Sequence, residues 1–152
     1  MRFNTKEDIE APIEFVFAQV ADVDAHERSA MRRGIEARRQ GALVAKGTKW
    51  HVKFDFRGKP RTADIEVTTF DQPTLVEFNF ESGGVAGVSR MELVPLSPNR
   101  TRMMVQIDLT PKTLAARLLV QSLKLAKANI TKKFKTRVAD LCEDIEKRHV
   151  TA

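Results

Sequence analysis

The sequence predicts an α+β fold in which a curved antiparallel sheet of about seven strands wraps around a long C-terminal helix, with two short helices after the first strand. Between residues 46 and 109, short runs of alternating apolar and polar side chains are separated by turns, which is typical of antiparallel strands. From Pro111 to about Lys147 there is no glycine and no further proline, which favours one long amphipathic helix. Such a helix buries its apolar stripe if the sheet curls around it, and that shape often leaves a hollow for a ligand.

The N-terminal part is expected to form one strand and the two short helices. Residues 2–10 alternate in polarity, which predicts a strand with one inward face. Pro12 suits the first position of a helix, and apolar residues at helical spacing follow as far as residue 21. Either Asp22 or Asp24 can cap a second short helix, which Gly34 ends.

Six further strands are expected between the short helices and the C-terminal helix. Turns rich in glycine, proline and aspartate separate them, as in a chain of antiparallel hairpins. The predicted strands are residues 35–40, 49–57 and 62–70, a strand with Val76, Phe78 and Phe80 on its inward side, and residues 85–94 and 101–109.

The C-terminal helix is expected to begin at Pro111, because Thr110 is a suitable cap and proline fits the first helical turn. At about 1.5 Å per residue the helix is roughly 50 Å long. Its inward side carries apolar residues at three- and four-residue steps, namely Leu119, Leu123, Ala126, Ile130, Phe134, Val138, Leu141 and Ile145.

The length and composition are those of one globular domain, residues 1–152. No apolar run approaches the roughly 18 residues that span a bilayer, and the N-terminus lacks the apolar core of a secretory signal, so we expect a cytoplasmic protein. The single cysteine, Cys142, excludes an internal disulfide and agrees with a reducing compartment. Its apolar neighbours predict a buried core thiol rather than a nucleophile.

The net charge of +6 is concentrated in the C-terminal helix. A basic helix face attracts anionic partners such as lipid head groups or nucleic acid, although the simpler interpretation is a solvated helix surface. Between Lys112 and Arg137 there is no acidic residue, and the basic residues are Lys112, Arg117, Lys124, Lys127, Lys132, Lys133, Lys135 and Arg137.

Two segments carry a family resemblance, IEAPIEFVFAQVAD near the N-terminus and TPKTLAARLLVQSLKLAKANITKKF near the C-terminus. In the first, a strand meets Ala11 and Pro12, an apolar helix carries Val16 and Phe17, and Asp22 follows. The chain resembles, over essentially its whole length, the START/birch-pollen-allergen (SRPBCC) superfamily, which includes bacterial polyketide cyclase/dehydrase-type and lipid-transport-type proteins. The resemblance implies a helix-grip fold with a cavity between sheet and helix, but no particular activity, because the superfamily shares a cavity rather than a catalytic motif.

The cavity implied by the resemblance is lined by inward strand residues and by the inner side of the helix. An aromatic-rich lining suits a hydrophobic ligand, although the same residues can also fill a packed core. Glu7 falls on an inward position, where a carboxylate is costly unless it bonds a ligand, water or another side chain. The predicted ligand-binding residues are Thr5, Glu7, Trp50, Val52, Phe54, Phe56, Phe78, Phe80, Ser89, Met91, Met103, Val105, Leu119 and Leu123.

The sequence predicts no catalytic residue, metal ligand or cofactor. Asp22, Asp24 and His26 are close enough in sequence for a metal site, but the aspartates suit helix capping better. The glycines of residues 83–87 open a strand and not a helix, so they do not form a phosphate-binding loop. The chain has no tyrosine, which removes one common general acid.

A second apolar stripe on the C-terminal helix consists of Leu114, Leu118 and Leu125, and Arg117, Lys124 and Lys135 lie between it and the inward stripe. Exposed leucines flanked by basic residues are typical of a contact surface, either for a second copy in a homodimer or for an anionic bilayer. The simplest alternative is that loops fold over this stripe.

Three functions are therefore compared. The first is non-enzymatic binding or transfer of a hydrophobic small molecule or lipid in the cavity. The second is a cyclase/dehydratase-like enzyme in which Glu7 moves a proton, and the third is a protein- or membrane-interaction module. Nucleic acid is the least favoured partner, because Phe134 is the one aromatic residue among the basic side chains of the helix.

Overall fold

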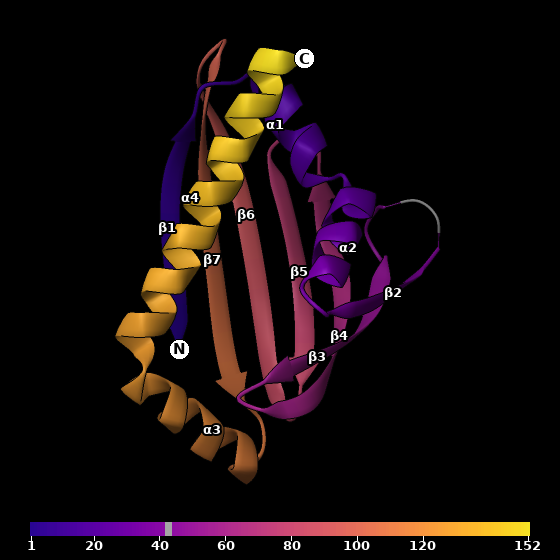
Figure 1. Ribbon diagram of the computed structural model, residues 1–152, viewed down its shortest axis with the longest axis vertical. Coiled ribbons are helices and arrows are strands. Elements are labelled where there is room, and N and C mark those ends of the chain that lie inside the picture. Colours follow the sequence, from indigo (N-terminus) through magenta and orange to yellow (C-terminus); the bar gives the residue numbers. More distant parts are fainter. Residues whose placement is uncertain (42–43) are drawn as a thin grey trace.

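The computed structural model of the protein describes residues 1–41 and 44–152. A single antiparallel sheet forms the back of the molecule, helices α1, α2 and α4 lie in front of it, and α3 lies at its lower end (Figure 1). The elements in chain order are β1 (Arg2–Ile9), α1 (Ile13–Val20), α2 (Val23–Arg32), β2 (Glu36–Gln40), β3 (Lys49–Phe56), β4 (Lys59–Asp71), β5 (Leu75–Ser82), β6 (Val85–Ser97), β7 (Arg100–Pro111), α3 (Leu114–Leu125) and α4 (Lys127–Thr151).

The sheet has the strand order β1-β7-β6-β5-β4-β3-β2, with every neighbouring pair antiparallel. Consecutive strands pair as a meander from β2 to β7, and β1 adds beside the last strand. The register aligns Phe78, Ser89, Ile107 and Phe3 in one row across four strands. Because side chains alternate between faces, these residues share the concave face that the helices cover, as the sequence predicts.

The core lies at the upper end of the concave face, where α1 and α4 pack against β1, β5, β6 and β7. Thr101 is fully buried there, and its hydroxyl donates a hydrogen bond of 2.8 Å to the carbonyl of Ala11 between β1 and α1. This bond satisfies two buried polar groups at once. The largest fully buried side chains are Phe17, Ile9, Leu93, Met103, Ile145 and Val16.

The long C-terminal helix is confirmed over Lys127–Thr151, but the predicted single helix is broken at Ala126. The amide of Ala126 bonds back to the carbonyl of Leu123 and not to a carbonyl four residues earlier, and α3 leaves at an angle to α4 (Figure 1). The two helices pack on different surfaces, since α4 contacts β1 whereas α3 packs on Val85 and Leu109 at the end of the sheet. Those two surfaces, rather than a helix-breaking residue, account for the break.

The start of the C-terminal helical region also differs from the prediction. Thr113, and not Thr110, is the cap, and its hydroxyl accepts a hydrogen bond of 3.1 Å from the amide of Ala116. Pro111 ends β7 opposite Val85 instead of opening a helix. The strand ladder of β6 and β7 therefore continues past the predicted cap and delays the helix by three residues.

Candidate functional site

The hairpin of β3 and β4 helps to enclose the concave face at its lower end. Figure 1 shows this hairpin crossing in front of the lower parts of β5 and β6. At its tip, the guanidinium of Arg57 donates a hydrogen bond to the hydroxyl of Ser122 in α3. The hairpin and α3 thus meet at the lower end of the concave face.

Aromatic side chains on this part of the concave face remain partly exposed. Phe78 and Phe80 of β5 lie on the same face as Trp50, Val52 and Phe54 of β3, and all five are only half-buried. Large apolar side chains that face inward and keep contact with solvent mean that close packing does not fill the space in front of them. This region is called the open concave face below.

Ser89 lies in the middle of the open concave face, between Phe78 on β5 and Ile107 on β7. The residue is only 5% exposed. Within residues 1–41 and 44–152 its hydroxyl has no hydrogen-bond partner, although no side-chain oxygen that is completely sealed from solvent lacks one. The hydroxyl therefore keeps a small contact with solvent instead of a bond within the described residues.

Gly87 is the neighbour of Phe80 across the β5–β6 ladder. A Cβ added at Gly87 would overlap the outer end of the Phe80 ring, so the ring occupies the place that a side chain at this position would take. A glycine at position 87 therefore allows the ring of Phe80 to approach the backbone of β6 closely.

Two of the predicted ligand-binding residues lie instead in the packed core. Met103 is completely buried and Met91 is 9% exposed, and both belong to the cluster beneath α1 and α4. Thr5 and Val105 pair across β1 and β7 and are partly exposed. The inward residues therefore form a packed core at the upper end of the face, whereas several of them at the lower end stay partly exposed.

The remaining predicted ligand-binding residues lie at the lower end. Leu123 is buried and Leu119 is partly buried, both on α3. Phe56 is 37% exposed at the hairpin tip, with the guanidinium groups of Arg57 and Arg61 within 6 Å of its ring centre, at 5.8 and 5.5 Å. These three residues border the open concave face rather than form its floor.

A polar network that the sequence analysis missed fixes α2 to the edge of the sheet. The indole nitrogen of Trp50 donates a hydrogen bond of 2.9 Å to Glu27, and Arg39 forms ion pairs with Glu27 at 3.3 Å and Asp24 at 2.9 Å. Arg39 is directly opposite Trp50 in the β2–β3 ladder. The alternation of inward and outward side chains along the short strand β2 predicts that Arg39 points inward. This alternation does not predict that Arg39 pairs with acidic residues of α2.

Glu7 is on the concave face, directly opposite Met103 in the β1–β7 ladder and partly exposed. Its charge acts on Cys142 of α4, whose sulfur lies 3.7 Å from that of Met103. Burial, followed by the negative charges of Glu7 and Glu146, raises the pKa of the Cys142 thiol to about 12. Cys142 is therefore a protonated core thiol and not a nucleophile.

Cys142 is expected to resist alkylation while the protein is folded. At pH 8 we expect iodoacetamide to modify the native protein at least about 100-fold more slowly than the urea-unfolded protein, because the reactive species is the thiolate. Intact-mass spectrometry over time measures both rates. Equal rates would contradict the buried position of the thiol.

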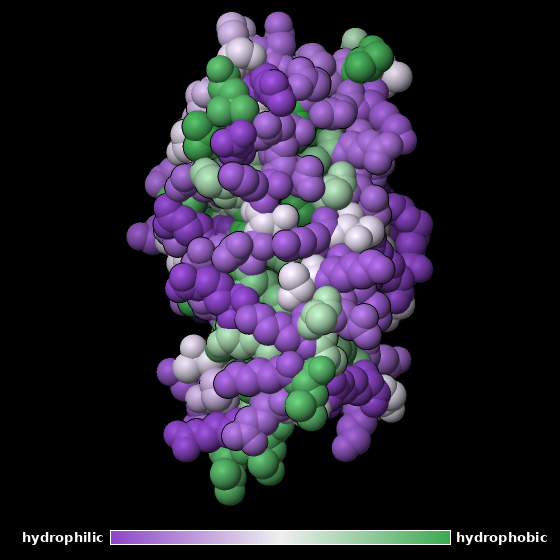
Figure 2. All heavy atoms as spheres, turned by 90° about the vertical axis from the view of Figure 1, so that its left-hand side faces the viewer, coloured by the Kyte–Doolittle hydropathy of each residue, from purple (hydrophilic) through white to green (hydrophobic). Residues whose placement is uncertain are grey.

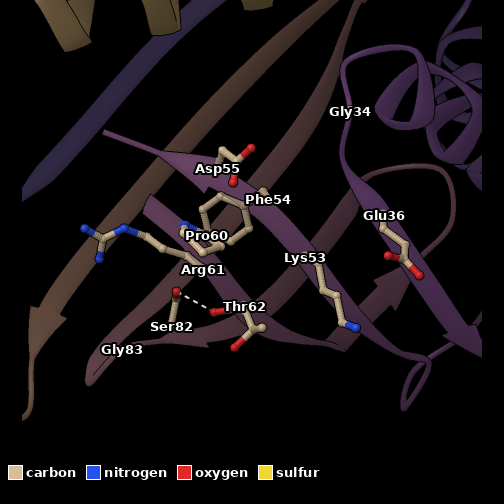
Figure 3. Close-up of a pocket in the computed structure, with 10 residues that line it drawn as sticks. All are labelled: Gly34, Glu36, Lys53, Phe54, Asp55, Pro60, Arg61, Thr62, Ser82 and Gly83. Carbon is tan, nitrogen blue, oxygen red and sulfur yellow. Dashed lines mark hydrogen bonds between the residues drawn. The ribbon is translucent and has the colours of Figure 1, made fainter. Parts of the chain in front are cut away.

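A pocket of about 510 Å³ adjoins the open concave face at Phe54, where β2 and β4 begin and β3 and β5 end (Figure 3). In it the hydroxyl of Ser82 donates a hydrogen bond of 2.6 Å to the carbonyl of Thr62. Two of its charged side chains are acidic and two are basic, so the lining favours neither an anionic nor a cationic ligand. The charged lining residues are Glu36, Lys53, Asp55 and Arg61.

The described residues hold no group of three histidine, cysteine, aspartate or glutamate side chains placed to bind a metal ion. Asp22 is instead the cap of α2, with its carboxylate 3.2 Å from the amide of Ala25. The imidazole of His26 contacts the carbonyl of Val20 at 2.8 Å. In the part of the chain that the structure describes, no helix has both the length and the apolar content to cross a membrane.

An antiparallel sheet gripping a long C-terminal helix, with two short helices after the first strand, is the helix-grip fold, and the family match of the chain places it in the START/birch-pollen-allergen superfamily. Within it, the chain belongs to the family described as polyketide cyclase/dehydrase and lipid transport, which matches residues 1–146. The resemblance noted in the sequence is thus confirmed. No functionally curated protein matches the chain.

Solved structures support the fold. The chain is similar to norcoclaurine synthase from Thalictrum flavum, with a TM-score of 0.71 and 13% identity over 100% of this chain and 87% of that one. It is also similar to the Zhui aromatase/cyclase from Streptomyces sp. R1128, with a TM-score of 0.69 and 13% identity over 97% and 94% of the two chains. It is similar to Ara h 8.0201 as well, with a TM-score of 0.64 and 13% identity over 100% of this chain and 99% of that one. At such identities the likeness shows the fold alone.

Proposed function

We propose that the protein binds or transfers a hydrophobic small molecule or lipid, which it holds against the open concave face. The observation that carries this proposal is the set of half-buried aromatic side chains around Ser89, whose hydroxyl has no partner among the described residues. Ligand sites in proteins are mostly apolar, with a few polar groups that orient the ligand. The aromatic rings would supply affinity, and the hydroxyl of Ser89 would select a ligand with a carbonyl, carboxyl or hydroxyl group.

An enzyme of the cyclase/dehydratase type is the alternative, with Glu7 as the proton-transferring group. Glu7 lies four residues along β1 from Phe3, which is in the row of Ser89, so Glu7 and Ser89 are about 13 Å apart along the strand direction and two strands apart across the sheet. Met103, opposite Glu7 in the ladder, and Cys142, on which its charge acts, belong to the packed core. This position favours a carrier over an enzyme, because a general acid has to reach the ligand.

A fluorescent apolar probe, 1-anilinonaphthalene-8-sulfonate, tests the proposal. Ser89→Phe places a large side chain on the open concave face and is expected to weaken probe binding at least about tenfold. Val88→Phe is the matched control, since Val88 is the adjacent residue, points to the opposite face and is 43% exposed. We expect this variant to bind the probe like the wild type.

Two further measurements complete the test. Ser89→Ala keeps the fold without adding bulk, and it is expected to bind a fatty acid about fivefold more weakly while binding the matching alkane unchanged. Native mass spectrometry of the gently purified protein, before and after denaturation, gives the mass of any ligand carried from the cell. Unchanged probe binding by a folded Ser89→Phe variant would refute the proposed site.

A cytoplasmic location accompanies this proposal. The single cysteine supports it, because it forms no internal disulfide and suits a reducing compartment.

A further inference from the structure

Helix α3 has two apolar sides, and the sheet accounts for one of them. Ala116 and Val120 are buried against Val85, with Leu119 packed beside them. On the other side, Leu114, Leu118 and Leu125 are 74%, 61% and 93% exposed. At about 100° per residue these three leucines fall within about 40° of one another around the helix, so they form one stripe.

No loop covers this leucine stripe in the described structure, and the simplest alternative from the sequence is therefore wrong. Figure 2 shows hydrophobic side chains gathered at the lower end of the molecule, where Figure 1 places α3. Three large aliphatic side chains held in water on a projecting helix are costly unless another surface covers them.

The charges beside the leucine stripe indicate what that surface is. Arg117 and Lys124 are exposed along one side of the stripe. They belong to the set of eight exposed basic residues between Lys112 and Arg137, none of which forms an ion pair within the described residues. Unpaired cations around exposed leucines are the pattern of helices that lie in the interface of an anionic bilayer.

A second copy of the chain fits this surface less well. Two copies meeting through the leucine stripe would bring Arg117 and Lys124 of one chain close to the same residues of the other, with no acidic side chain of α3 to offset the repulsion. An anionic bilayer instead covers the leucines with acyl chains and the cations with phosphate groups.

We propose that α3 docks the protein on anionic lipid bilayers, with Leu114, Leu118 and Leu125 inserted and Arg117 and Lys124 on the lipid phosphates. At about 1.5 Å per residue, the 12 residues of α3 are about 18 Å long and lie parallel to the bilayer surface. Docking also brings the hairpin tip near the lipid, because Arg57 contacts Ser122 on the same helix. The proposal stands independently of the ligand on the concave face.

Vesicle flotation of the whole protein tests the docking. We expect binding to phosphatidylcholine vesicles that contain about 30% phosphatidylglycerol, and at least about tenfold weaker binding to pure phosphatidylcholine. Leu118→Asp is expected to lower binding to the anionic vesicles at least about 20-fold, since it removes an inserted side chain and adds a negative charge. Circular dichroism confirms that the variant folds, as this exposed position has no core contact.

Two double variants separate the contribution of the leucines to vesicle binding from that of the basic residues. Leu114→Gln with Leu118→Gln should weaken binding at low and high salt alike, whereas Arg117→Gln with Lys124→Gln should weaken it at low salt and flatten its salt dependence. Leu96→Gln is the matched control, because Leu96 is 43% exposed on β6 outside α3, and it should bind like the wild type. Unchanged vesicle binding by the two leucine variants would overturn the proposal, as would a dimer in light scattering that Leu118→Asp dissociates.

Discussion

Replacing Phe17 by alanine is expected to lower the free energy of unfolding by about 3–5 kcal/mol, which is a large part of the stability of an ordinary domain. Phe17 is 1% exposed on α1, and its ring meets that of Phe70 edge-on with the ring centres 5.3 Å apart. Removing it leaves a cavity between α1 and the sheet that the neighbouring side chains can only partly fill. Urea unfolding followed by circular dichroism measures the change.

Phe56→Ala is the control for this substitution, because it removes the same ring from an exposed position at the β3–β4 tip. We expect a loss of about 1 kcal/mol or less, corresponding to the contacts of the ring with two guanidinium groups. Similar losses for Phe17→Ala and Phe56→Ala would mean that the core beneath α1 does not dominate stability.

Replacing Gly87 by alanine is expected to reduce probe binding on the open concave face at least about tenfold and to destabilise the fold by about 1–3 kcal/mol. The new Cβ would occupy the place where the ring of Phe80 lies, so the ring must rise from the sheet into the space proposed for the ligand. Fluorescence titration with 1-anilinonaphthalene-8-sulfonate and urea unfolding measure the two effects.

A second substitution tests whether Phe80 causes both effects. In Gly87→Ala with Phe80→Leu the side chain at position 80 is smaller, so we expect much of the stability and of the probe binding to return. Additive losses in the double variant would show that the ring of Phe80 is not what disturbs the site.

Side-chain alternation and the positions of prolines and glycines were enough to predict the strands. Strands β3 to β7 match predicted runs to within a few residues, because a strand with one buried face has a period of two that a single sequence displays. The break at Ala126 carries no such local signal, since neither glycine nor proline is present. It depends on α3 and α4 meeting surfaces built from other parts of the chain.

In the candidate site, too, the sequence predicts the features that have a local pattern and misses those that depend on packing. The period of two placed Phe78, Phe80 and Ser89 on one face correctly. It could not separate Met91 and Met103 from them, since the packing of α1 and α4 decides which part of that face is filled. The network of Glu27, Arg39 and Trp50 joins three consecutive elements, α2, β2 and β3, through side chains whose partners depend on how the elements pack, so no local pattern predicts it.

The strand order has a consequence for how the chain avoids aggregation. In an open sheet, the two outermost strands expose backbone groups on which another chain can add, and here these are β1 and β2. Helix α4 packs along β1, and β2 is only five residues long. Three residues of β2 are charged, and two of them, Arg38 and Glu36, form an exposed ion pair. One outermost strand is therefore held by a helix on its inner face, and the other is too short and too charged to recruit a neighbouring sheet.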